Sequence, residues 1–67
     1  MRQERLEAKM AEKKVKDQDC AKALGIDSST FWRKKTGVNE FDRDEIKGLK
    51  TLMGLTAEEV DFIFFED

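Results

Sequence analysis

Apolar residues recur at helical spacing in five stretches of the chain, and polar turns separate the stretches. In the first stretch Leu6 and Met10 lie four residues apart among charged neighbours. Later, Ile46, Leu49 and Met53 repeat at intervals of three and four. Residues at this spacing share one face of an α-helix, whereas a strand would alternate every second residue. The pattern therefore predicts an all-α single domain over residues 1–67, with helices at about 3–13, 17–24, 28–35, 42–53 and 56–65.

Turn and cap residues stand at the ends of these stretches. Gly25 follows the second stretch, at the position where a left-handed residue commonly ends a helix. Either Asp27 or Ser28 caps the third helix, because a short side-chain oxygen satisfies its free amide groups. Asp42 opens a capping box, and Phe41 just before it is placed as a hydrophobic staple. These signals agree with the helical boundaries.

The charge distribution is uneven along the chain. The net charge is −2, which by itself disfavours nucleic acid. Residues 1–16, however, carry six basic and three acidic side chains, whereas residues 38–67 carry three basic and nine acidic ones. A basic first half joined to an acidic second half indicates one anion-facing side. The basic excess is small, so any phosphate binding should be modest and selective.

Several classes of site are not supported by the composition. The chain has one cysteine, Cys20, and no histidine, which leaves no internal disulfide and no common zinc or catalytic histidine arrangement. No apolar run approaches membrane-spanning length, and residues 1–10 lack the apolar core of a signal peptide. We expect no enzyme activity, no cofactor, no metal and no membrane contact, and a reducing cytoplasm as the location.

Residues 17–37, DQDCAKALGIDSSTFWRKKTG, resemble the helix-turn-helix of the lambda-repressor-like family, of the Cro and phage-repressor (XRE-like) type. The matching residues are Ala21, Gly25, Ile26 and Phe31. Two helices crossing steeply over a short turn need a small residue at their contact and a permissive one in the turn. The resemblance extends from about residue 4 to residue 65. It implies a compact five-helix domain.

The resemblance also implies that the third helix enters the DNA major groove. Its candidate base-reading residues are Ser28, Ser29, Trp32 and Arg33. Arg33 is the strongest reader, because a guanidinium matches the two acceptors of guanine. The candidate phosphate contacts flank this helix. They are Gln18, which stands one position after the usual family glutamine, and Lys13, Lys14, Lys16, Lys35, Thr36 and Asn39.

Each of these residues also has a simpler interpretation. Ser28 can serve as a cap alone, and Arg33 and the lysines can be solvated side chains. Lys34 stands where the family usually keeps a branched apolar residue. Either its aliphatic stem covers the core while its amine reaches solvent, or Trp32 fills the gap. The sequence leaves open whether Trp32 faces DNA or the core. Cys20 is expected to be a buried structural residue.

The aromatic run at 62–65 has two interpretations. Ile63 and Phe64 continue the buried face, so Phe62 and Phe65 point elsewhere. Two exposed phenylalanines on a small domain indicate a partner surface, and we favour a homodimer interface because family members commonly dimerise near the fifth helix. Alternatively, the helix ends early and both rings fold back on the core.

Two functional hypotheses follow. The first is a sequence-specific transcription regulator that binds double-stranded DNA, of phage or prophage Cro or repressor type, acting as a homodimer in the cytoplasm of a bacterial or phage-infected cell. The second is a protein-interaction module on the same fold that has lost DNA binding, such as an antitoxin or antirepressor. The acidic second half of the chain motivates it.

Overall fold

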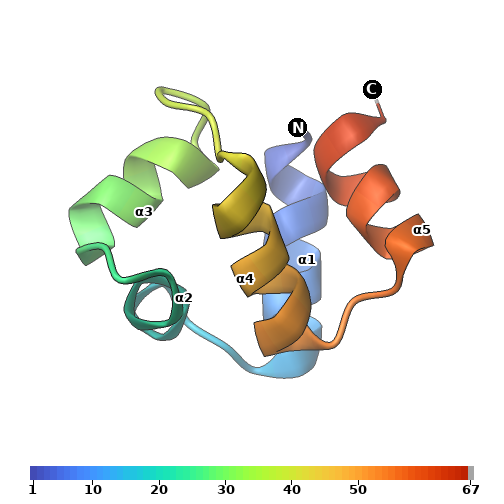
Figure 1. Ribbon diagram of the computed structural model, residues 1–67, viewed down its shortest axis with the longest axis horizontal. Coiled ribbons are helices and arrows are strands. Elements are labelled where there is room, and N and C mark those ends of the chain that lie inside the picture. The colour runs from blue at the N-terminus through green and yellow to red at the C-terminus, as the bar shows by residue number, and fades with distance from the viewer. Residues whose placement is uncertain (67) are drawn as a thin grey trace.

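The computed structural model describes residues 1–66, and over that range the chain is helical with no strand (Figure 1). The first three helices have the predicted bounds, and the fourth begins one residue later because Asp42 is its cap. The elements are α1 (Gln3–Lys13), α2 (Asp17–Leu24), α3 (Ser28–Lys35), α4 (Arg43–Met53), α5 (Ala57–Val60) and a π-helical continuation η1 (Asp61–Phe65).

The turn between α2 and α3 sets their crossing. Gly25 adopts φ 71°, a left-handed conformation that glycine tolerates without a Cβ penalty. Asp27 caps α3 by accepting a 2.7 Å hydrogen bond from the Thr30 amide, so Ser28 is the first helical residue and not the cap. Figure 1 looks nearly along the axis of α2 while α3 lies across the view, so the two helices are steeply inclined.

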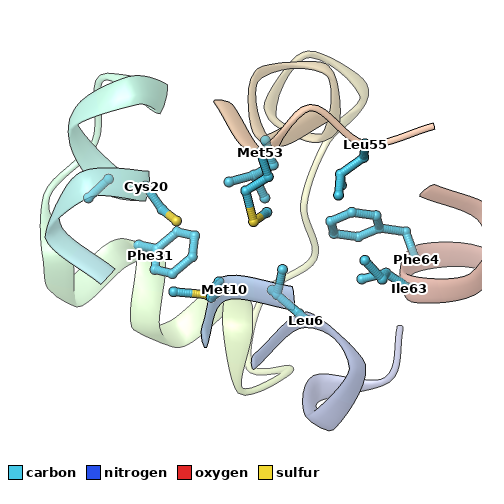
Figure 2. Close-up of a cluster of buried hydrophobic side chains, with 10 residues drawn as sticks. Leu6, Met10, Cys20, Phe31, Met53, Leu55, Ile63 and Phe64 are labelled. Carbon is cyan, nitrogen blue, oxygen red and sulfur yellow. The ribbon is translucent and has the colours of Figure 1, made fainter. Parts of the chain in front are cut away.

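The core is a cluster of buried apolar side chains from α1, α2, α3, α4 and η1 (Figure 2), and the partly buried Val60 of α5 packs against it. Phe31 of α3 is fully buried on the side of Cys20 and Met10, and Ile63 and Phe64 close the other end. The Phe41 ring lies 5.7 Å from Phe31 and 5.8 Å from Phe64, between ring centroids. These tilted and edge-on pairs link α3 to the carboxy-terminal helix through the segment before α4.

Helices α2 and α4 approach closely at Gly48. A Cβ atom added there would lie 2.6 Å from Leu24 Cδ2. Glycine inside a helix costs about 1 kcal/mol relative to alanine, so its place here has a packing reason. The absent side chain lets Leu24 lie directly on the α4 backbone.

The last helix differs from the single helix predicted over residues 56–65. Its final turns widen, and the Glu66 amide bonds to the Asp61 carbonyl five residues earlier at 2.8 Å. Carbonyls at a helix end lack partners within the helix. Two of them are satisfied from the amino-terminal end of the chain, because the Arg2 amide donates to Ile63 O at 3.1 Å and the Arg5 guanidinium donates to Phe62 O at 2.7 Å. The amino terminus thus anchors the carboxy-terminal helix.

An ion pair makes a second connection between α1 and α5. Lys9 Nζ lies 2.6 Å from Glu59 Oε2 and 3.2 Å from Glu12 Oε2. The hydrogen bond from Lys9, with those from the Thr56 amide and hydroxyl, lowers the pKa of Glu59 to about 2. A carboxyl whose pKa is lower in the folded state stabilises that state above its unfolded pKa and loses the contribution as pH falls.

We therefore expect the free energy of unfolding to decrease as pH falls from about 4.5 towards 2, and Glu59→Gln to make that decrease shallower. Urea unfolding at a series of pH values, followed by circular dichroism, measures the slope. Asp44→Asn, which removes an exposed carboxylate on the far side of α4, is the control. Equal slopes for wild type and Glu59→Gln would contradict the assignment.

Candidate nucleic-acid interface

The outward face of α3 carries the four residues predicted to read bases. Ser28, Ser29, Trp32 and Arg33 are all exposed. Trp32 is 53% exposed, so it does not belong to the core. The buried Phe31 fixes the rotation of the helix, because each residue turns the next about 100° around the axis. These four side chains therefore share the solvent side.

Lys34 occupies the gap that Trp32 leaves. Its side chain is only 16% exposed, and Nζ lies 3.0 Å from Glu45 Oε1 and 3.2 Å from the Glu40 carbonyl. The stem borders the hollow that Phe41 and Ile46 also line. The side chain is mostly covered, as the prediction for its stem requires, but the ammonium pairs with Glu45 of α4 and does not reach open solvent.

Arg33 is held in place without being neutralised. Its guanidinium donates a 3.3 Å hydrogen bond to the Thr30 hydroxyl. Among residues 1–66, no carboxylate oxygen lies within 4.0 Å of it. A guanidinium that retains most of its donors is available to phosphate or to a base edge.

Lys35 is not available for the phosphate contact that was predicted for it. Its side chain is buried, and Nζ pairs with Asp17 Oδ1 at 2.8 Å and with Glu7 Oε1 at 3.5 Å. Hydrogen bonding and charge from these carboxylates outweigh the burial that lowers the pKa of Lys35, so its pKa is raised. The sequence did not indicate this role, because Glu7 and Asp17 are distant along the chain. Lys35 connects α3 to α2 and α1.

The hydrogen-bond donors of Thr36 are also used within the protein. Its hydroxyl donates toward the carbonyls of Trp32 and Arg33, at 2.9 and 3.3 Å, and its amide bonds to the same Trp32 carbonyl. Both donors therefore complete the end of α3, and neither is left for phosphate. Asn39 lies beyond this end and is exposed. Its backbone amide donates a hydrogen bond to the Arg33 carbonyl at 3.2 Å.

The remaining phosphate candidates flank the start of α2. Lys13, Lys14, Lys16 and Gln18 are exposed. Lys13 lies 3.8 Å from Glu12, a contact that water screens at so exposed a position. Lys22 is a further exposed cation that the sequence reasoning did not select. Its position one turn after Gln18 was the available signal.

The Cys20 thiol lies beneath this surface and is buried. Burial, with smaller contributions from Asp17 and Asp19, raises its pKa to about 11. The thiol is therefore protonated near neutral pH, and its expected role as a small core residue agrees with its place in the packing.

Comparison with family models, with curated proteins and with solved structures finds no match to this chain. Within the described residues, no group of three or more ligating side chains is placed to hold a metal ion. No helix in residues 1–66 is both long and apolar enough to cross a membrane.

The single tryptophan reports directly on this face. Because Trp32 is exposed, we expect acrylamide to quench its fluorescence in the native protein nearly as well as in the urea-unfolded protein. Acrylamide is neutral, so the neighbouring cations do not bias the collision rate. Strong protection of the native emission from quenching would place the indole inside the protein and contradict the arrangement.

Proposed function

We propose that this chain is a sequence-specific regulator of transcription that binds double-stranded DNA and reads the major groove with α3. In this proposal α2 and α3 form a helix-turn-helix, as the resemblance to lambda-repressor-like proteins implies. The main support is the outward face of α3, where the exposed indole of Trp32 lies beside Arg33, which forms no ion pair in the described residues. A phage or prophage repressor or Cro-type role is the corresponding biological context.

Physical chemistry favours this interpretation of the α3 face. Trp32, 53% exposed, stands beside an arginine and two serines, and this combination of an aromatic face with hydrogen-bonding groups suits a nucleic-acid partner. Beside it, Arg33 can form a bidentate contact with guanine, while the Ser28 and Ser29 hydroxyls can donate or accept. The indole can lie against a thymine methyl group or along the sugar-phosphate backbone.

The buried Lys35 favours anion binding at the start of α2 indirectly, through its effect on the charge of Asp17. Asp17 stands in the first turn of α2, close to where a phosphate would be bound. Its carboxylate would repel that phosphate if its charge were free. Lys35 compensates for this charge at 2.8 Å. Asp19 in the same turn caps the helix by accepting a hydrogen bond from the Lys16 amide at 2.9 Å, so Lys16 and Gln18 are the exposed side chains there that can meet a phosphate.

We include dimerisation in the proposal. Phe62 and Phe65 are 49% and 65% exposed on the carboxy-terminal helix, which lies on the other side of α4 from α3 (Figure 1). A pair of such domains would bind two half-sites, as symmetric helix-turn-helix proteins do. The alternative, an interaction module without DNA binding, predicts a stable protein complex and no enrichment of any duplex.

Selection from a random duplex pool tests DNA binding and reading by α3 together. We expect a preferred site to be enriched, and Arg33→Ala to cost about 1–3 kcal/mol at one base-pair position and relax the preference there. Competition binding with duplexes varied at each position measures the loss. Failure to enrich any duplex would refute the proposal.

Arg2→Ala is the matched control, because it removes an exposed arginine from the start of α1. It should leave the selected sequence unchanged. If Arg33→Ala and Arg2→Ala behave alike on the selected site, α3 is not the reading helix.

The salt dependence of DNA binding distinguishes Lys16, a proposed phosphate contact, from Lys35, which has a structural role. Lys16→Ala should weaken binding evenly across sequences and reduce the slope of log K against log salt by about one. Lys35→Met should instead lower thermal stability, because it leaves Asp17 without its partner. Fluorescence anisotropy at several salt concentrations, with thermal melts, makes the comparison. A Lys16→Ala slope equal to that of wild type would exclude a phosphate contact there.

A further inference from the structure

All three basic residues of the acidic second half lie in one row along α4. Arg43, Lys47 and Lys50 are spaced by four and three residues, which places them on one face of the helix. All three are exposed, and within residues 1–66 none has a carboxylate oxygen within 4.0 Å. The acidic residues Asp42 and Asp44 border a different hollow, beside α2. Helix α4 therefore separates its positive and negative charges.

The basic row borders a groove between α4 and the carboxy-terminal helix. The groove has a volume of 520 Å³, and apolar side chains form much of its wall. Phe41 and Ile46 contribute from the α4 side, and Ala57 and Val60 from α5. Phe65, 65% exposed, forms part of its rim. An apolar floor with unneutralised cations along one edge suits an acidic, apolar helix surface.

The neighbouring ridge of the carboxy-terminal helix carries two carboxylates and the exposed Phe65 ring, whereas the Arg5 guanidinium lies 3.9 Å from the centroid of its other ring, Phe62. We define the ridge as Glu58, Asp61, Phe62 and Phe65, all of which are exposed. Asp61 borders both the α4 groove and the hollow between α1 and α5, so it stands at the crest between them. Neither Glu58 nor Asp61 has a cation within 4.0 Å in the described part of the chain.

We propose that the α4 groove is the docking site for the ridge of a second copy of this chain, in a twofold dimer. Ridge and groove adjoin, so a twofold axis between them can place each ridge in the groove of the other copy. Asp61 and Glu58 then face the partner's basic row, while Phe65 is withdrawn from water. This inference rests on the dimer included in the proposed function and specifies its interface and register.

Charge reversal with mixing tests the interface in the absence of DNA. Lys47→Glu and Asp61→Lys should each raise the dimer dissociation constant about ten-fold or more, because each variant meets two like-charge contacts in its own dimer. An equimolar mixture should recover association, since both contacts in the mixed dimer are again opposite in charge. Sedimentation equilibrium measures each case, and added salt should weaken the wild-type dimer.

Asp44→Lys on the other side of α4 is the control, and it should leave association unchanged. Thermal melts by circular dichroism check that each variant is folded. A wild type that stays monomeric, a single reversal without effect, or a mixture without recovery would overturn the proposal. Recovery on mixing is not expected if the groove binds an acidic helix of a different protein.

Binding to the selected half-site distinguishes this inference from the DNA-binding proposal. Lys47→Glu should retain half-site contacts made through α3 and lose cooperative occupancy of a double site. If no duplex is enriched while the mixture still recovers association, DNA reading fails and the dimer stands. If a duplex is enriched but the mixture does not recover association, the DNA-binding proposal stands and the dimer interface is wrong.

Discussion

Burial of the Phe31 ring is the contact on which the arrangement of the outer surface depends. Helix α3 has only eight residues, too few to be stable in water without tertiary packing. Phe31 is its fully buried apolar anchor, and it determines which way the helix is rotated. Trp32 follows it in the chain and is directed into solvent as a consequence. Substituting a smaller residue at Phe31 would loosen the whole candidate interface and not one contact alone.

Two consecutive lysines, Lys34 and Lys35, hold α3 in this orientation by forming ion pairs with the helices on either side of it. Lys34 reaches α4 through Glu45, and Lys35 reaches α2 and α1 through Asp17 and Glu7. Neither ammonium is in open solvent, so both residues act as structural parts of the domain. The cationic surface left for an anion is correspondingly small. It consists of Arg33 and the exposed lysines near the start of α2, which fits an acidic protein whose binding would be selective.

The aromatic row links the candidate DNA surface to the carboxy-terminal helix. Phe41 contacts both Phe31 and Phe64, so α3 and the helix that carries the proposed dimer ridge share one core. A shared core holds the two surfaces in a fixed relation, which is what binding to two half-sites at a set spacing would require. The surfaces themselves use different residues, because α4 lies between them.

The sequence alone determined the helical architecture. The apolar spacing, Gly25 and the cap at Asp42 are local signals, and helices are built from local contacts, so their bounds were predictable through α4. The widened turns of η1 were not, because Arg2 and Arg5 satisfy its carbonyls from the other end of the chain. The exposed positions of Ser28, Ser29 and Arg33 followed from helical periodicity and the resemblance.

Tertiary structure decided the roles of the residues whose partners are distant in the chain. Trp32 could face either way until it was found to be 53% exposed. Lys35 and Thr36 resembled surface donors until their ion pairs and hydrogen bonds were known. The groove and ridge likewise depend on how α5 lies against α4. Periodicity shows which side of a helix a residue occupies, but the neighbouring helices determine whether its charge is neutralised.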